Sequence, residues 1–336
     1  MSKEDTAVEP LIKNFVKFIS PDPDKTDEIR DLKNRVKENI KNQAIADGLT
    51  VKQTPDSGSF ATKTGLRRHM LGNSEVLGQD VDLPFVVAPK DKDGESLTYL
   101  LDRFEKYAIA SYPDTKRKRT KSSIQLEFES YKAAIDLVPL FYVPGSENQI
   151  LVRADGERRE TNISKHKDFI LNRTKSSKEA SELEFNNIIR LLKWWRCECQ
   201  SNGSLEVPSF LINLLCAHAY DNRKLRGSYI ETLADWFGFL AGEITARRRI
   251  VFTDFTKGPG PDSTARWQVI DPVNPANNIV ENMKGYELEE LTDWFSSARD
   301  RMADVVVAER MGERSEAIEL LSGLFGSSFA NNCEAE

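Results

Sequence analysis

The sequence predicts an α+β fold: a first half that mixes strands with helices, and a second half that is mostly helical. In the segment 80–87, apolar residues alternate with polar ones at a period of two, which is typical of a strand. Segments 123–130 and 133–144 are further strand candidates, separated by only a few residues and therefore expected to pair antiparallel. After Glu160 the apolar residues recur every three or four positions, which is typical of helices.

This change of period predicts two domains and a short tail. We expect residues 1–165 to hold an N-terminal helix and the sheet, residues 166–330 to form a helical domain, and residues 331–336 to be a flexible tail. The segments of the second part that we predict to be helical are 182–196, 208–220, 229–248 and 287–311.

Composition limits the classes of protein that the chain can belong to. Its 47 Lys and Arg stand against 53 Asp and Glu, so stable binding of duplex nucleic acid through a basic surface is not expected. No apolar run approaches the length of a membrane span, and the N-terminus lacks a signal-peptide pattern, so we expect a cytoplasmic protein with no membrane partner. Four cysteines do not make a disulfide framework in 336 residues, which fits a reducing compartment.

Local patterns in the first half predict several elements in order. Residues 24–48 form an amphipathic pattern that predicts a long helix, with a glycine, Gly48, to end it. Residues 50–60 predict a short strand, a Gly-Ser turn and the start of a helix, and residues 96–112 predict another helix. The basic run KRKRTK, 116–121, is typical of a solvated loop; the alternative is a surface that guides an acceptor nucleotide or an activating polymer.

Carboxylates inside the predicted strands are the main chemical signal. Asp80 and Asp82 lie two residues apart and so share one strand face, and Asp136 lies in the middle of another strand. An Asp-x-Asp pair alone is also typical of a turn or a solvated edge. Three carboxylates on neighbouring strands can hold two divalent cations, and Mg²⁺, with Mn²⁺ as the alternative, suits oxygen ligands of this kind. We therefore predict a two-metal site for phosphoryl transfer in which Asp136 accepts the proton of the attacking hydroxyl.

A Gly-Ser turn precedes these strands. Gly58 has no side chain and permits close approach of the backbone to a phosphate, and the Ser59 hydroxyl can bond to phosphate oxygens. We expect this turn to contact the triphosphate of a nucleotide.

The order of these motifs resembles a known family. GSFATKTGLR, DVDLPFVV and AAIDLVPLF resemble the nucleotidyltransferase core of the polymerase-β-like superfamily, and within it the branch of oligoadenylate synthases, cyclic GMP-AMP synthase and the bacterial cGAS/DncV-like nucleotidyltransferases (CD-NTases). RLLKWWR, VPSFLINLL, IDPVNPANNIV and LFGSSF resemble later segments of that branch, in the same order. The resemblance implies a bilobal protein: a core with a mixed sheet, and a helical domain that closes over the nucleotides.

The resemblance also implies roles for single residues. It makes the three aspartates the metal ligands and places the Gly-Ser turn on the donor triphosphate. Lys193 matches a triphosphate-binding lysine, and Ser209 and Phe210 match a pair that touches phosphate and stacks on a base. Without the resemblance, Lys193 is typical of a solvated helix lysine and Phe210 of a core aromatic. In the family's Gly-Ser-x-x-Arg-x-Thr pattern the first basic residue is displaced here to Lys63.

The function that the resemblance implies is synthesis of a cyclic di- or trinucleotide second messenger from NTPs, ATP among them, with release of pyrophosphate. It further implies a place in bacterial antiphage (CBASS) defence, an effector protein gated by the messenger, and, for some relatives, a conjugation enzyme or a HORMA-type regulator. Two alternatives share the motifs: a linear polymerase that makes oligoadenylate or extends RNA ends, and a catalytically silent scaffold that binds nucleotide. The bases used, the linkage and the ring size are not encoded in any motif that the sequence presents.

Overall fold

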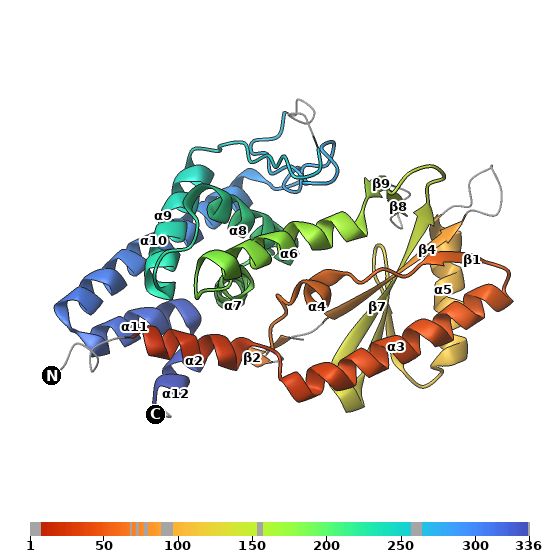
Figure 1. The fold of residues 1–336 in the computed structure, drawn as a ribbon, viewed down its shortest axis with the longest axis horizontal. Helices are drawn as coiled ribbons and strands as arrows, with labels where there is room; N and C mark the ends of the chain where they lie inside the picture. Colours follow the sequence, from red (N-terminus) through yellow and green to blue (C-terminus); the bar gives the residue numbers. More distant parts are fainter. Residues whose placement is uncertain are drawn as a thin grey trace. The chain divides into compact units, whose positions relative to one another are not determined.

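The computed structural model describes residues 8–67, 69–71, 74–76, 80–88, 97–152, 157–256 and 264–334. The chain divides into two compact units, each with its own core (Figure 1). We call them the sheet unit, Pro21–Met70 with Glu75–Phe169, and the helical unit, Met1–Ser20 with Leu71–Ser74 and Ile170–Glu336. The predicted α+β class, with a mixed sheet and a helical part, is confirmed.

The sheet unit is built on one mixed sheet in which the strands follow the order β1-β4-β7-β6-β5, while β8 pairs with β7 and β9 with β8. Strands β4 and β7 run parallel, and β6 and β7 run antiparallel, as the sequence predicts for 123–144. A separate small sheet pairs β2 with β3. The bounds are β1 Thr50–Gln53, β2 His69–Leu71, β3 Ser74–Val76, β4 Asp80–Ala88, β5 Lys116–Arg119, β6 Ile124–Phe128, β7 Ala133–Tyr142, β8 Gln149–Val152 and β9 Arg158–Thr161.

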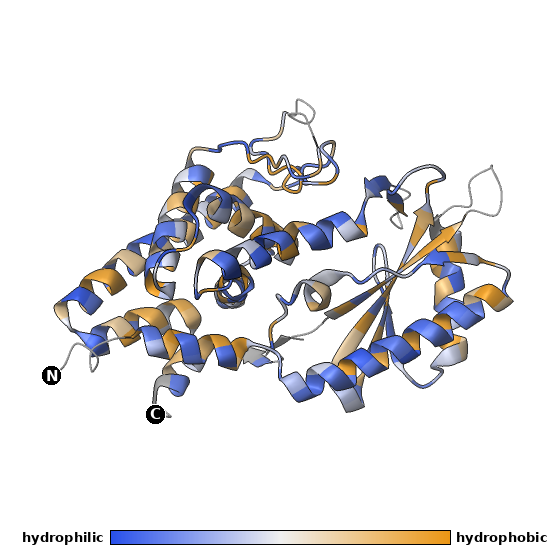
Figure 2. Cartoon of the chain, viewed as in Figure 1, coloured by the Kyte–Doolittle hydropathy of each residue, from blue (hydrophilic) through white to orange (hydrophobic). Residues whose placement is uncertain are grey.

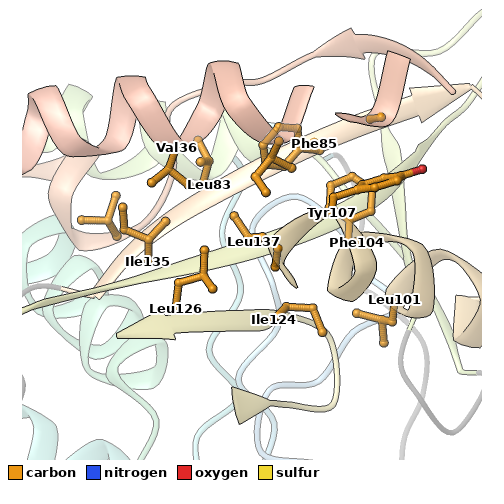
Figure 3. Packing of buried hydrophobic residues seen from close by; sticks show 14 of the residues in the cluster. Val36, Leu83, Phe85, Leu101, Phe104, Tyr107, Ile124, Leu126, Ile135 and Leu137 are labelled. Atoms are coloured by element: carbon orange, nitrogen blue, oxygen red, sulfur yellow. The ribbon is translucent and has the colours of Figure 1, made fainter. Parts of the chain in front are cut away.

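One face of this sheet is covered by helices α3 (Pro23–Ala46) and α5 (Leu97–Ser111). Much of β4 and β7 is hydrophobic, whereas α3 carries mostly hydrophilic residues outside its buried stripe (Figure 2). Val36 of α3 lies near Leu83 of β4, and Phe85 packs against Phe104 of α5 with ring centroids 5.2 Å apart (Figure 3). The odd-numbered side chains of β4 are therefore buried against the helices, and its even-numbered side chains lie on the opposite face of the sheet.

Helix α3 follows the prediction for 24–48 closely. Asp22 caps its start by accepting a hydrogen bond from the Asp24 N–H, and Pro23 occupies the first turn. At its other end Gly48 adopts a left-handed conformation with φ 75°, which glycine tolerates best. The carboxylate of Asp47, the residue that ends the helix, accepts hydrogen bonds from Arg103 and Tyr107 of α5, so the two covering helices are tied together.

The helical unit packs around a cluster of aromatic side chains. Phe15 lies 5.5 Å from Trp194 and 5.1 Å from Phe329 between ring centroids, and the Trp194 indole donates to the carbonyl of Phe325. The four predicted helices of this part are confirmed as α7 to α10, whereas α2, α6, α11 and α12 were not predicted from the sequence. The bounds are α2 Glu9–Ile19, α6 Ile163–Ala180, α7 Phe185–Asn202, α8 Ser209–Arg223, α9 Tyr229–Thr245, α10 Gly285–Met311, α11 Arg314–Phe325 and α12 Ser327–Glu334.

Two further details differ from expectation. The basic run 116–121 is not a loop: residues 116–119 form edge strand β5, because they pair with β6. Residues 331–334 of the expected tail continue helix α12, which begins at Ser327 and whose Phe329 is buried in the aromatic cluster. No helix among the described residues is long and apolar enough to cross a membrane.

Phe85→Ala tests the packing between sheet and helices. Phe85 is fully buried, so the substitution leaves a cavity, and we expect the free energy of unfolding to fall by about 3–5 kcal/mol in urea titrations. Ile109→Ala is the matched control, because Ile109 lies on α5 but is exposed and should change that energy by less than about 1 kcal/mol. Equal losses in the two variants would contradict the packing described here.

Candidate functional site

Two of the three predicted carboxylates lie side by side on neighbouring strands. In the parallel register of β4 and β7, Asp82 is the direct partner of Asp136. Parallel neighbours in register present their side chains on the same face, about 5 Å apart. Both residues are partly buried. The backbone of Asp80 begins β4, opposite Ala134, but its side chain lies outside the described structure.

Asp136 is held by two donors from the β6 side. The Ser123 hydroxyl donates to its Oδ1 at 2.7 Å, and the Gln125 amide donates to its Oδ2 at 3.2 Å. Gln125 can do so because it is the antiparallel partner of Asp136 in the β6–β7 register. Sequence reasoning missed both residues, although their spacing of two in SIQLEF is a signal that they share one strand face.

Asp82 lies against the predicted Gly-Ser turn. Gly58 has φ 71°, and a Cβ added there would stand 1.9 Å from Oδ2 of Asp82. Glycine is therefore required at this position for two reasons: the left-handed backbone conformation, and the Asp82 carboxylate, which leaves no room for a Cβ. The structure brings Gly58 to Asp82, and Asp82 to Asp136.

The Gly-Ser turn is a short ordered element. Residues Gly58–Thr62 form helix α4, the Thr62 hydroxyl donates to the Gly58 carbonyl at 3.0 Å, and the Thr64 N–H donates to the Ser59 carbonyl at 3.0 Å. The helix ends where Lys63 takes a left-handed conformation with φ 56°. Thr62 and Thr64 thereby fix the backbone on both sides of Ser59.

A buried cation from α3 anchors the same turn. The Lys33 ammonium forms an ion pair with Asp56 and lies 5.6 Å from the centroid of the Phe60 ring. The hydrogen bond from Lys33 lowers the pKa of the Asp56 carboxyl below its ordinary value. Asp56 precedes the turn and Phe60 follows Ser59, so one side chain of α3 holds both of its ends.

The other predicted residues lie in the helical unit. Lys193 of α7 is buried, and this burial, together with the nearby Arg196, lowers the pKa of its ammonium to about 7. Ser209, exposed at the start of α8, accepts a hydrogen bond from Arg196 at 2.6 Å, and Phe210 beside it is partly buried. Sequence reasoning missed Arg196; its place three positions after Lys193 puts the two on the same side of α7.

The segment IDPVNPANNIV, which resembles a family motif, has a structural role here. The carboxylate of Asp271 is buried and accepts from the N–H groups of Val273 and Asn274 and from the side-chain amide of Asn277. The side-chain oxygen Oδ1 of Asn278, also buried, accepts a hydrogen bond from the Val269 N–H. These bonds fix the path of an irregular loop.

The described residues fit a divalent cation. Mg²⁺ prefers carboxylate oxygens. Asp82 and Asp136 supply carboxylates on one face, and the two hydrogen bonds to Asp136 leave lone pairs on both of its oxygens. No cluster of three or more His, Cys, Asp or Glu that could hold a metal occurs among the described side chains, from which Asp80 is missing.

Comparison with known proteins gives consistent matches. Residues 7–173 match the family model of the second messenger oligonucleotide or dinucleotide synthetase (SMODS) domain. The chain is 29% identical over 289 residues to a cyclic AMP-AMP-AMP synthase of Escherichia coli, with 84% of each chain covered.

Solved structures agree in fold along nearly the whole chain. The CdnC protein of E. coli MS115-1 with ATP matches with a TM-score of 0.80 and 25% identity, covering 96% of this chain and 99% of that one. The complex of the same protein with a HORMA protein gives a TM-score of 0.76 and 27% identity, covering 96% and 98%.

Gly58→Ala tests the contact between the turn and Asp82. The added methyl group meets the Asp82 carboxylate and also strains a left-handed backbone, so we expect the free energy of unfolding to fall by about 2–4 kcal/mol, with weaker Mn²⁺ binding. The measurements are urea titration and Mn²⁺ titration followed by electron paramagnetic resonance.

Gly145→Ala is the control for Gly58→Ala. Gly145 has φ 75° but nothing within 4 Å of an added Cβ, so this variant carries the backbone strain alone. We expect a loss of about 1 kcal/mol and unchanged Mn²⁺ affinity. If the two variants behave alike, close packing of Gly58 on Asp82 is not the constraint.

Lys193→Met tests the cost of the buried ammonium. Because the pKa falls from 10.5 in the unfolded chain to about 7 in the folded one, the folded state carries the full penalty below pH 7 and loses it as pH rises toward 10.5. Lys193→Met should therefore raise the free energy of unfolding, by roughly 1–4 kcal/mol at pH 6 and by less at pH 9. Lys175→Met on α6, at an exposed position, is the control; a pH-independent gain in Lys193→Met would contradict the shift.

Proposed function

Because the chain belongs to the CD-NTase family, with residues 7–173 matching the SMODS domain, we propose how its residues make a cyclic oligonucleotide. The enzyme is a nucleotidyltransferase that joins NTPs into a cyclic second messenger and releases pyrophosphate. The observation that carries this function is the register that sets Asp82 beside Asp136, within the segment that matches the SMODS domain.

We propose that ATP is a substrate and that the product is a cyclic di- or trinucleotide. A relative that matches this chain along 84% of its length is a cyclic AMP-AMP-AMP synthase, and a related solved structure contains ATP. In each step a ribose hydroxyl of one nucleotide attacks the α-phosphorus of another. A phosphodiester bond forms, the bond to the pyrophosphate breaks, and the same step in the opposite sense closes the ring.

In this proposal Asp80, Asp82 and Asp136 hold two Mg²⁺ ions, which Mn²⁺ can replace. Bound there, the ions would lower the pKa of the attacking hydroxyl and neutralise charge on the triphosphate. Asp136 accepts the proton of that hydroxyl, and its two hydrogen bonds from the β6 side keep it oriented while it does so.

The nucleotide contacts follow from the same assignment. Gly58 and Ser59 contact the donor triphosphate from α4. In the helical unit Lys193 binds phosphate, Ser209 touches phosphate and Phe210 stacks on a base; Arg196 orients the Ser209 hydroxyl. Binding of an anion favours the charged form of Lys193, so it offsets the cost of burying that side chain.

The partners follow from the product and from one relative. We propose an effector protein that the cyclic nucleotide gates, in a bacterial antiphage (CBASS) system. A regulator of the HORMA type is the protein partner that we favour, because a related CdnC forms a complex with one. A conjugation enzyme is the alternative partner.

Asp136→Asn tests this function. The purified chain is incubated with labelled ATP and Mg²⁺ or Mn²⁺, treated with phosphatase and separated by chromatography. We expect a phosphatase-resistant product from the wild type and at least about 10³-fold less from Asp136→Asn or Asp82→Asn, which keep the shape of the carboxylate but remove its charge.

Asp102→Asn is the control, because Asp102 is an exposed carboxylate of α5. Its ion-pair partner Arg119 still pairs with Glu105 in this variant. It should retain wild-type yield. A phosphatase-sensitive ladder from the wild type would favour the linear polymerase instead. Nucleotide binding without pyrophosphate release, with every NTP and with a HORMA partner added, would favour the silent scaffold.

A further inference from the structure

Three residues of the basic run 116–121 are bound by other groups of the sheet unit. Lys116 pairs with Glu127, and Arg119 pairs with Asp102 and Glu105 of α5. Arg117 donates to three backbone carbonyls between residues 112 and 115. These contacts hold β5 at the edge of the sheet, and the run ends in a turn, 120–123, that leads into β6.

That turn is closed by one side chain. The Thr120 N–H donates to the Ser123 carbonyl at 2.9 Å. In return, Oγ1 of Thr120 accepts the N–H groups of Ser122 at 3.2 Å and of Ser123 at 2.9 Å. The same Oγ1 lies 2.8 Å from the hydroxyl oxygen of Ser123, which is buried, and that hydroxyl in turn bonds to Asp136.

The hydrogen bonds from Thr120 through Ser123 to Asp136 all donate in the same direction, toward the carboxylate. A hydroxyl has one proton and two acceptor lone pairs. The two backbone N–H groups occupy both lone pairs of Thr120, so its proton is left to donate, and the Ser123 hydroxyl oxygen is the nearer acceptor at 2.8 Å; the Ser123 carbonyl lies at 3.3 Å. Ser123 accepts this bond and directs its own proton at Oδ1 of Asp136.

We propose that Thr120 and Ser123 are positioning residues of the reaction. The turn after β5 fixes the Thr120 hydroxyl, which fixes the rotamer of Ser123, which orients the Asp136 carboxylate toward a divalent cation and the attacking hydroxyl. Gln125 restrains the other oxygen, Oδ2, so removal of one hydroxyl leaves Asp136 in place but with one restraint fewer on rotation about its Cβ–Cγ bond. Partners of this kind, one step removed from a metal ligand, affect metal affinity and turnover about 10- to 100-fold.

This inference rests on the proposed function, because it takes Asp136 as a metal ligand. Thr120→Val is the central variant, since valine keeps the shape of threonine and removes only the hydroxyl. Thr120→Ser is the rescue, and Ser122→Ala is the matched control, because only the backbone of Ser122 takes part in the turn. Ser123→Ala removes the second hydroxyl, and Asp136→Asn removes the ligand.

Two quantities are measured on the full chain: the affinity for Mn²⁺ with a non-hydrolysable ATP analogue, by electron paramagnetic resonance, and the kcat and KM of pyrophosphate release from ATP. We expect Ser123→Ala to weaken Mn²⁺ binding about tenfold and Thr120→Val, one bond further from Asp136, about 3- to 10-fold; both should lower kcat about tenfold, with KM for ATP within about twofold of the wild type. Thr120→Ser should recover most of both losses, and Ser122→Ala should match the wild type.

Thermal melting separates positioning from unfolding: a loss of Mn²⁺ affinity at temperatures where the melting curve shows the variant folded supports the inference. If Asp136→Asn weakens Mn²⁺ binding and Thr120→Val does not, the inference is overturned and the proposed function stands. If Asp136→Asn binds Mn²⁺ as the wild type does, the metal site of the proposed function fails. A kcat loss in Thr120→Val that Thr120→Ser does not recover would overturn the role of the hydroxyl.

Discussion

Strands β4 and β7 run parallel with Asp82 opposite Asp136, and the whole candidate site depends on this register. The side chains of a strand alternate between its two faces, so a slip of one residue would turn one carboxylate into the apolar layer beneath α3 and α5. Leu83, Phe85 and Leu137 fill that layer and are fully buried, which makes such a slip costly. The core of the sheet unit thus sets the position of its polar face.

The two carboxylates are then held by different means. Asp82 is confined by the backbone of Gly58, whose turn is anchored to α3 through Lys33. Asp136 is oriented by hydrogen bonds from Ser123 and Gln125, and the Ser123 hydroxyl is in turn bonded to Thr120 in the turn after β5. Helix α4 on one side of the β4–β7 pair and strand β6 on the other therefore contact the same pair of carboxylates. Each restrains a carboxylate without adding a charged side chain next to it. Carboxylates restrained in this way would need little reorganisation to hold the cation of the proposed site.

Most of the fold could be predicted from the sequence, because helices and strands follow from local patterns of apolar residues. Periods of two and of three to four gave the strands and helices, and the end of α3 at Gly48 followed from one residue type. Helix α2 was missed although its buried side chains, Ile12, Phe15 and Ile19 among them, recur at helical spacing, so its local signal was present in the sequence. The parallel register of β4 with β7 and the role of the Thr120 hydroxyl could not be predicted, since pairing across 54 residues and hydrogen bonds in a polar turn leave no periodic pattern in the sequence.

The most direct test of the account is the position of a bound cation. Crystals of the chain with Mn²⁺ and a non-hydrolysable ATP analogue are measured at the manganese absorption edge, where anomalous scattering locates the metal independently of the protein model. We expect a peak about 2.1 Å from carboxylate oxygens of both Asp82 and Asp136. Manganese bound with nucleotide at a place that neither carboxylate touches would contradict it.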